Sequence, residues 1–177
     1  NYMEVLLSSD KIAECINALA DMIISKTARS EKIAVIGIRS RGEILAKRLS
    51  DVISKKLGTK IPNGTLDITL YRDDFNRPQG HEQPVVRSTE IGFDVDNTVI
   101  ILVDDVLYTG RSCRAAMDAL IDLGRPKAIR LAVLVERSGR ELPICADFVG
   151  YKIDLPPEKS VQVNFVESDG NDRVIVI

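Results

Sequence analysis

Apolar runs of strand length alternate along the chain with segments whose hydrophobic residues recur at the helical period. Unbroken runs of Val, Ile, Leu and Ala are typical of strands buried on both faces of a parallel sheet. The pattern therefore predicts an α/β fold with a central, mostly parallel sheet flanked by helices. The expected helices are Ser9–Ser25 (with Ser9 or Asp10 as its N-cap), a segment from Gly42 onward, and a segment after Gly110 that stops at Gly124 and Pro126. The expected strands are Lys32–Ile38, Leu66–Tyr71, Val99–Val103, Ala128–Val135, Ala146–Gly150, Val161–Val166 and Arg173–Ile177.

The stretch Val99–Ser112 (VIILVDDVLYTGRS) joins a buried strand to an amphipathic helix through a polar loop. We expect the strand to end at Asp104 and Asp105, because two adjacent carboxylates cannot both enter an apolar core without a large desolvation cost. Thr109 offers a hydroxyl, and Gly110 lets the backbone approach a ligand closely. Loop N–H groups and the positive end of a helix bind phosphate at such places. The stretch predicts a ribose-phosphate site; an ordinary turn capped by Asp105 is the alternative.

A second strand-to-helix junction carries the sequence Arg39-Ser40-Arg41-Gly42. An arginine offers a fork of donors that matches phosphate oxygens, and a glycine permits close approach. Alone, this tetrapeptide would be interpreted as a solvated basic turn. Beside a ribose-phosphate loop it predicts a cradle for a diphosphate.

Four blocks of the sequence together resemble one known family. VIILVDDVLYTGRS resembles the 5-phosphoribosyl-1-pyrophosphate (PRPP) signature of the type I phosphoribosyltransferases. The resemblance extends to IGIRSRGEILAKRL (Ile36–Leu49), DITLYRDD (Asp67–Asp74) and GRELPICADFVG (Gly139–Gly150). It is closest to the pyrimidine operon attenuation proteins that are also uracil phosphoribosyltransferases. The resemblance implies one phosphoribosyltransferase domain over residues 1–177, with a flexible hood at about residues 71–93.

The family resemblance implies transfer of ribose 5-phosphate from PRPP to uracil, which gives UMP and pyrophosphate with Mg²⁺ as cofactor. Asp104, Asp105 and Arg41 match the family's catalytic positions. The two aspartates would hold the ribose and, for the most part indirectly, the Mg²⁺. Ser40 and Arg41 would bind the pyrophosphate. The other implied contacts are Val106, Leu107, Tyr108, Thr109, Gly110, Arg111 and Ser112 for PRPP, Arg72 and Arg87 in the hood, and Arg137 and Val161 beside the base.

The same family also binds RNA and attenuates pyrimidine operon transcription in response to UMP. A chain that is primarily such an attenuator, with weak or vestigial transferase activity, is therefore the alternative. This sequence departs from the family's RNA-binding pattern, because Asn17, Ala18 and Asp21 replace a Thr-Arg pair and a nearby histidine. Each lost phosphate contact weakens RNA binding.

The second RNA-binding segment departs in a similar way. Gly139 and Cys145 stand where the family has a histidine and an arginine, whereas Arg140 is kept. An RNA leader is expected as a partner if other basic residues replace the lost contacts. Lys26, Arg29 and Lys152 are the candidates for that replacement.

Composition and charge narrow this picture only a little. The 177 residues, 45% hydrophobic and 28% charged, fit one globular domain, and the net charge of −2 gives no global case for nucleic-acid binding. No apolar run reaches membrane length and no signal-peptide pattern is present, so we expect a cytoplasmic protein. Cys15, Cys113 and Cys145 lack metal-ligand spacing and are expected to be reduced, small core residues. By resemblance, the protein forms a homodimer or a higher homo-oligomer.

Overall fold

The computed structural model describes residues 3–69 and 89–177 of the chain. In this part, five parallel strands form a sheet in the order β3-β2-β4-β5-β6, and three antiparallel strands form a smaller sheet in the order β1-β8-β7. The elements are β1 (Glu4–Leu7), α1 (Ser9–Lys26), β2 (Ile33–Ile38), α2 (Arg41–Leu57), β3 (Asn63–Leu66), β4 (Val99–Leu107), α3 (Arg111–Leu123), β5 (Ala128–Arg137), β6 (Phe148–Ile153), β7 (Val161–Asn164), α4 (Val166–Asp169) and β8 (Arg173–Val176).

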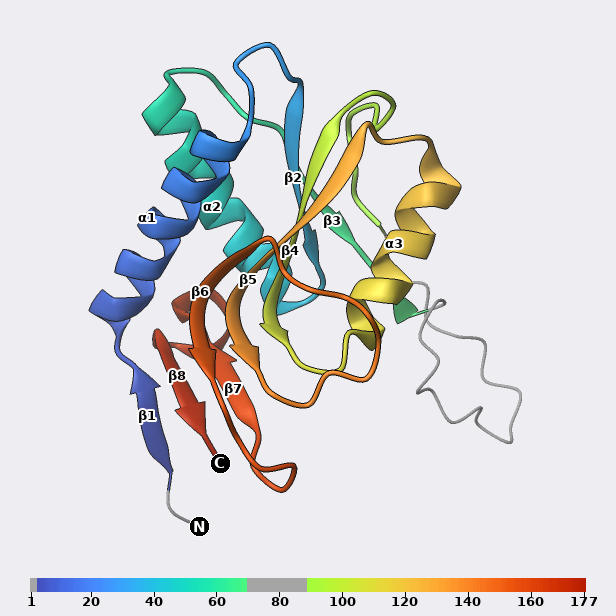
Figure 1. The fold of residues 1–177 in the computed structure, drawn as a ribbon. Coiled ribbons are helices and arrows are strands. Elements are labelled where there is room, and N and C mark those ends of the chain that lie inside the picture. Colours follow the sequence, from blue (N-terminus) through green and yellow to red (C-terminus); the bar gives the residue numbers. More distant parts are fainter. Residues whose placement is uncertain (1–2, 70–88) are drawn as a thin grey trace.

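Helices cover both faces of the large sheet, with α1 and α2 on one face and α3 on the other (Figure 1). Side chains alternate between the faces along each strand, so β4 contributes to two cores. Ile101 and Val103 pack with α1 and α2, whereas Ile100 and Leu102 pack against α3. Because both faces are buried, the strands consist of unbroken apolar runs. This confirms the expected α/β fold with a central parallel sheet flanked by helices.

The expected helices are present, with small shifts at their ends. The α1 helix begins at Ser9 as expected, but its N-cap is Ser8 instead of Ser9 or Asp10, because the Ser8 side chain accepts a hydrogen bond from the Lys11 N–H. The α2 helix ends at Leu57 and is capped by Gly58, whose φ of 68° favours glycine. The α3 helix ends at Leu123, directly before the expected Gly124. No helix in residues 3–69 and 89–177 is long and apolar enough to cross a membrane.

The strands β3, β4 and β6 differ most from the sequence-based expectation, and β6 lies at Phe148–Ile153 instead of Ala146–Gly150. The expected strand Leu66–Tyr71 is wrong as far as Thr69, and its last two residues lie outside the described part of the chain. The β3 strand lies earlier, at Asn63–Leu66, where it pairs with β2 up to Ile38. Beyond Ile38, β2 turns into the α2 junction and offers no further partner. The β4 strand continues to Leu107 instead of ending at Val103, because β5 pairs with it as far as Glu136.

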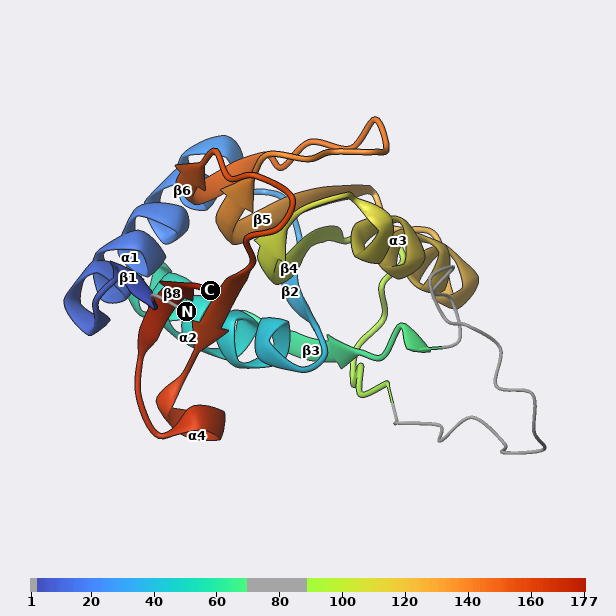
Figure 2. The same ribbon diagram turned by 90° about the horizontal axis from the view of Figure 1, so that it is seen from below.

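The smaller sheet brings together the two ends of the described chain. Its strand β1, which the sequence analysis did not anticipate, pairs with β8, and β8 pairs with β7. Viewed from below, this sheet lies beside α1 and α2, near the end of the large sheet at which β4 finishes (Figure 2). Phe165 and Val174 from this region are fully buried in the same core as α1 and α2. The smaller sheet is therefore packed onto the large one.

Candidate functional site

Asp104 and Asp105 lie in the part of β4 that has a strand partner on one side only. The pairing of β2 with β4 ends at Gly37 and Val103, whereas β5 remains paired until Leu107. The sequence analysis placed both aspartates beyond the strand, but the structure places them within it, at the point where the β2 side opens. An exposed strand edge at the carboxyl end of a parallel sheet is a typical ligand position.

Each of the two carboxylates is held in place by a neighbouring backbone group. Oδ1 of Asp104 accepts a hydrogen bond of 2.9 Å from the Asp105 N–H, and Oδ1 of Asp105 accepts one of 2.9 Å from the Val106 N–H. Both residues are only partly buried. These bonds fix the orientation of the carboxylates at the sheet edge, where they can accept hydrogen bonds from vicinal hydroxyls.

The loop after β4 and the first turn of α3 line a cavity of about 400 Å³. Gly110 has a φ of 93°, a conformation that favours glycine, and α3 begins at the next residue. The Thr109 hydroxyl accepts a hydrogen bond from the Arg111 N–H. The structure thus brings Asp104 and the whole predicted segment Val106–Ser112 together around one cavity at a helix N-terminus, which suits a phosphate.

Cys113 lies at the floor of this cavity and is buried. Burial, and then the charge of Asp104, raise the pKa of its thiol to about 12. The thiol is therefore neutral at physiological pH and is a small core residue, as expected, rather than a nucleophile.

The Arg39-Ser40-Arg41-Gly42 junction lies directly against the aspartates. A Cβ atom on Gly42 would lie 2.8 Å from the Val103 carbonyl oxygen and 3.3 Å from Asp104 Cα, so only glycine allows this approach. Ser40 precedes the first residue of α2, and the peptide bond between Arg39 and Ser40 is cis. The two motifs that the sequence singled out, 60 residues apart, therefore meet at one place.

The side chain of Arg41 reaches from this junction to the C-terminal part of the chain. Its Nη2 donates a hydrogen bond of 2.8 Å to Oδ1 of Asp169 in α4. Its Nε is buried and has no hydrogen-bond acceptor in the described part of the chain. Arg41 is the first residue of α2, and its buried Nε–H group has no acceptor in the described residues. It can therefore donate a hydrogen bond to an additional anionic ligand.

The segment after β5 is tied to the phosphate loop. The backbone N–H groups of Glu141 and Leu142 donate to the Thr109 carbonyl at 3.0 and 3.1 Å, and Nε of Arg111 donates to the Glu141 carboxylate at 2.8 Å. This segment includes Gly139 and Cys145, the two departures from the family's RNA-binding pattern. Its conformation is thus coupled to that of the loop that would hold the 5-phosphate.

Arg137, predicted to lie near the base, is 5% exposed and directs its guanidinium at backbone carbonyls. The acceptors are the carbonyls of Ser138, Leu155, Pro156 and Lys159, the last through a short bond. Its Cζ also lies 4.1 Å from the centre of the Tyr108 ring. Arg137 therefore joins the phosphate loop to the segment that leads into β7, which begins at Val161.

The positions at which this sequence departs from the family's RNA-binding pattern are exposed on the described structure. Asn17 and Ala18 are exposed on α1, and the Asp21 carboxylate forms an ion pair of 3.0 Å with Lys56. Cys145 is also exposed, contrary to the expectation of a core residue, and its Sγ accepts a 2.7 Å hydrogen bond from Nη1 of Arg140. The ion pair partly offsets the negative charge that Asp21 would present to a phosphate.

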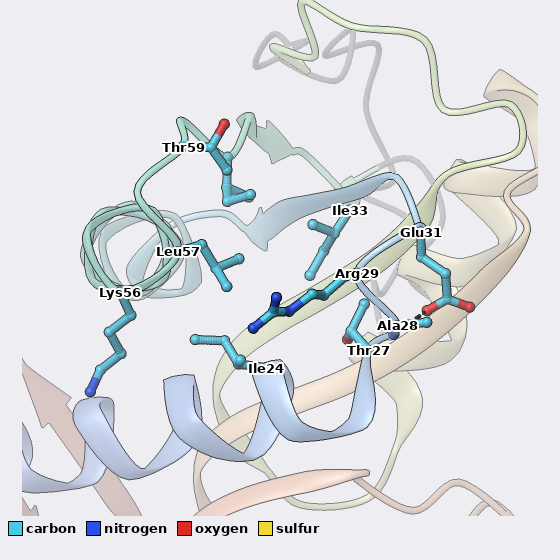
Figure 3. Close-up of a pocket in the computed structure, with 10 residues that line it drawn as sticks. Ile24, Thr27, Ala28, Arg29, Glu31, Ile33, Lys56, Leu57 and Thr59 are labelled. Atoms are coloured by element: carbon cyan, nitrogen blue, oxygen red, sulfur yellow. Dashed lines mark hydrogen bonds between the residues drawn. The ribbon is translucent and has the colours of Figure 1, made fainter.

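Another cavity, of about 500 Å³, lies at the other end of the large sheet (Figure 3). Its walls come from the C-terminal ends of α1 and α2, and the side chain of Arg29 extends across it between Ile24 and Ile33 (Figure 3). A cation at the carbonyl ends of two helices is favourably placed. This cavity is lined by none of the predicted site residues.

Some predictions fall on residues that the structure does not describe. Arg72 and Arg87 belong to residues 70–88, as does most of the expected hood at 71–93. In residues 3–69 and 89–177, no group of three or more His, Cys, Asp and Glu side chains could hold a metal ion by itself. The Asp104 and Asp105 carboxylates are hard oxygen donors, which fits a Mg²⁺ that is bound mainly by a substrate.

Asp169 and Glu141 are the neighbours of the site that the sequence analysis missed. Glu141 was within a quoted motif, but Asp169 is one of several acidic residues after β7 and has no distinctive local pattern. Only the three-dimensional contact with Arg41 identifies it.

Comparison with known proteins agrees with this geometry. The family model "Phosphoribosyl transferase domain" matches residues 4–167. The bifunctional protein PyrR of Syntrophobacter fumaroxidans is 48% identical over 99% of this chain and 94% of its own, and that of Deinococcus radiodurans is 49% identical over 96% and 91%. Among solved structures, the hypoxanthine phosphoribosyltransferase of Trypanosoma cruzi superposes with a TM-score of 0.71 at 14% identity, over 98% of this chain and 95% of the other.

The structural likeness confirms the type I phosphoribosyltransferase fold, and the sequence relatives confirm the narrower resemblance. We conclude that the chain belongs to the phosphoribosyl transferase domain family and, within it, to the bifunctional PyrR proteins.

Proposed function

We propose that the protein transfers the 5-phosphoribosyl group of PRPP to uracil, releasing pyrophosphate and forming UMP. The observation that carries this proposal is the contact between Gly42 and Asp104, which unites the diphosphate junction with the ribose-phosphate loop. PRPP has one 5-phosphate, one ribose and one pyrophosphate in a row. The loop at the start of α3, the aspartates on β4 and the start of α2 offer three adjoining sites in that order.

In the proposed reaction, the N1 atom of uracil forms a bond to the anomeric carbon as the bond from that carbon to the pyrophosphate oxygen breaks. Uracil loses its N1 proton to solvent, and pyrophosphate leaves with the electron pair of the broken bond. Mg²⁺, when bound with PRPP, neutralises charge on the leaving pyrophosphate. The protein has to align the two reactants and stabilise the developing charges, so it needs no nucleophilic side chain.

Each protein group then has one task. Asp104 and Asp105 hold the ribose hydroxyls and stabilise positive charge on the sugar ring. Backbone N–H groups of the loop that follows Val106, up to Gly110, bind the 5-phosphate with the hydroxyls of Thr109 and Ser112, since the Val106 N–H itself donates to Asp105. Ser40 and Arg41 bind the pyrophosphate. Arg137 acts on the base side by holding the segment before Val161, because its own donors are used by carbonyls. Arg72 and Arg87 remain proposed contacts of the hood.

The enzymatic proposal is tested with purified protein, labelled PRPP, Mg²⁺ and each nucleobase in turn. We expect UMP from uracil and no comparable product from the other bases. The absence of turnover with every base would contradict it.

We further propose that the protein regulates transcription by binding an RNA leader in response to UMP, since the relatives are named bifunctional. Both partners are made in the cytoplasm, where the protein would act. The bonds from Glu141 and Leu142 to the Thr109 carbonyl support this, because they connect the phosphate loop to the segment that carries Arg140. A filter-binding titration with the operon leader, with and without UMP, tests the proposal.

Cys145→Arg makes this test sharper. The residue is exposed, so an arginine is accommodated without repacking. We expect tighter RNA binding and a salt dependence steeper by about one counterion. RNA binding that is absent in both proteins, or that is indifferent to UMP, would contradict the regulatory proposal and leave the enzymatic one standing.

A further inference from the structure

The two carboxylate oxygens of Asp169 accept hydrogen bonds from different parts of the chain. Oδ2 accepts hydrogen bonds from the Phe165 N–H at 2.9 Å and from the Ser168 hydroxyl at 2.8 Å. Oδ1 accepts the 2.8 Å bond from Nη2 of Arg41. The side chain of Asp169 is 17% exposed and that of Arg41 is 34% exposed. One oxygen therefore fixes the carboxylate to its own segment, and the other fixes the arginine.

This contact belongs to a larger connection between α2 and the acidic segment 165–172. Arg48, two helical turns after Arg41, binds Asp172 through two bonds of 2.8 Å and also binds Glu167. Its guanidinium lies 4.7 Å from the ring centre of the buried Phe165. Because Arg48 and Phe165 already attach the two elements, the attachment does not require the Arg41–Asp169 pair. The hydrogen bond between Arg41 and Asp169 can therefore act on the position of the Arg41 side chain in the binding site.

We infer that Asp169 is a positioning residue, which holds the Arg41 side chain where it binds the pyrophosphate of PRPP. This inference rests on the proposed function. The bond uses one donor of the guanidinium and leaves the buried Nε without an acceptor in the described residues. An arginine held at one edge loses little conformational freedom when an anion binds to its other donors, so the affinity for that anion rises.

The test is Asp169→Asn. An amide presents one oxygen and one NH₂ group, so it cannot accept from both Arg41 and the Phe165 N–H. We expect the KM for PRPP and the inhibition constant of pyrophosphate to rise by about tenfold, the size of one charge-assisted hydrogen bond. The KM for uracil is expected to stay within about twofold, which a general loss of structure would not spare.

Glu167→Gln is the matched control. It removes a carboxylate from the same short helix, but that carboxylate contacts Arg48 instead of Arg41. We expect it to change the KM for PRPP by less than about twofold. In a double-mutant cycle, Asp169→Asn is expected to have no further effect on PRPP once Arg41 is replaced by glutamine, because the aspartate acts through the arginine.

Three results would overturn the inference. The first is an equal KM for PRPP in Asp169→Asn and Glu167→Gln, and the second is additive effects of the Asp169 and Arg41 substitutions in the double-mutant cycle. The third is a lower KM for PRPP in Asp169→Asn, which would mean that Asp169 competes with pyrophosphate for Arg41. If Asp169→Asn does not fold, Asp169→Glu replaces it, with an expected rise of at least about threefold because the longer side chain displaces Arg41. A wild-type protein that neither binds PRPP nor forms UMP would overturn the proposed function itself, and the inference with it.

Discussion

The Asp105 side chain has both a structural role, through its hydrogen bond with the backbone, and a proposed role in binding the ribose. Its Oδ1 accepts the Val106 N–H, a bond that an asparagine oxygen can also accept. Asp105→Asn should therefore stay folded while it loses the charge that we propose to face the ribose. We expect the KM for PRPP to rise by about tenfold or more, measured by steady-state kinetics, with the melting temperature within about 2 °C.

Asp94→Asn is a suitable control for that substitution. Asp94 accepts the Asp96 N–H at 2.8 Å in a similar local bond, but it lies near the opposite end of the sheet. Its replacement should leave the kinetics unchanged. Equal kinetic constants for wild type and Asp105→Asn would contradict the ribose role.

We expect Arg137 to contribute mainly to the stability of the fold, because backbone carbonyls accept the hydrogen bonds of its guanidinium. It is 5% exposed and satisfies carbonyls on both sides of the 155–159 turn. Arg137→Leu should lower the free energy of unfolding by about 3 kcal/mol, because buried carbonyls lose their donors. Urea denaturation measures this, and Arg140→Leu, at an exposed arginine, should cost less than about 0.5 kcal/mol. A cost of that small size for Arg137→Leu would show that its bonds contribute little.

At the scale of elements, the segment after β5 and the phosphate loop fit together through Gly139. A Cβ on Gly139 would lie 2.3 Å from Cε2 of Tyr108, and the φ of Gly139 is 117°. Gly139→Ala should therefore displace Tyr108, lower the free energy of unfolding by about 2 kcal/mol and raise the KM for PRPP. Gly58→Ala is the control, since Gly58 has a φ of 68° and open space around it. It should cost about 1 kcal/mol and leave the KM unchanged.

The contact between α2 and the segment 165–172 gives the protein a pH-dependent stability. The Arg48 guanidinium, together with the Val166 N–H, holds the pKa of Asp172 below its ordinary value of 3.8. A depressed pKa stabilises the fold above the unfolded value, and this stabilisation is lost as the pH falls through the folded value. Asp172→Asn should lower the free energy of unfolding by about 2 kcal/mol at pH 7. The difference from wild type should shrink below about pH 4.

Urea denaturation across this pH range measures the effect. Asp51→Asn, which breaks an exposed ion pair on the same helix, should change little at any pH. A difference between Asp172→Asn and wild type that stays constant down to pH 2 would contradict the role of the carboxylate.

Elements that are local in sequence could be predicted, and those that depend on distant pairing could not. The strand–loop–helix units around Asp104 and Arg41 are continuous in the chain, so their chemistry was visible there. The position of β3 depends on where β2 ends, and β1 depends on a partner at the other end of the chain. Similarly, nothing near Asp169 or Arg137 in sequence shows whether a side chain meets a ligand, a carbonyl or another charge.

At the scale of the whole molecule, PRPP binding should stabilise the fold. A ligand at one hundred times its dissociation constant adds about 2.7 kcal/mol to the free energy of unfolding. For a domain of this size that corresponds to a rise of about 5–10 °C in the melting temperature. We expect this rise with PRPP and Mg²⁺, and we expect EDTA to remove most of it. A rise that EDTA leaves intact would contradict the proposed cofactor.

The pairing of β1 with β8 sets the order in which the protein can assemble during synthesis. As the ribosome makes the chain, β1 leaves the exit tunnel long before β8 exists. The large sheet from β2 to β6 can form first, but the small sheet can close only after β8 has been released from the tunnel. A nascent chain that has not yet reached β8 therefore carries the loop after β4 without the completed small sheet, and β1 waits for its partner until β8 has been made.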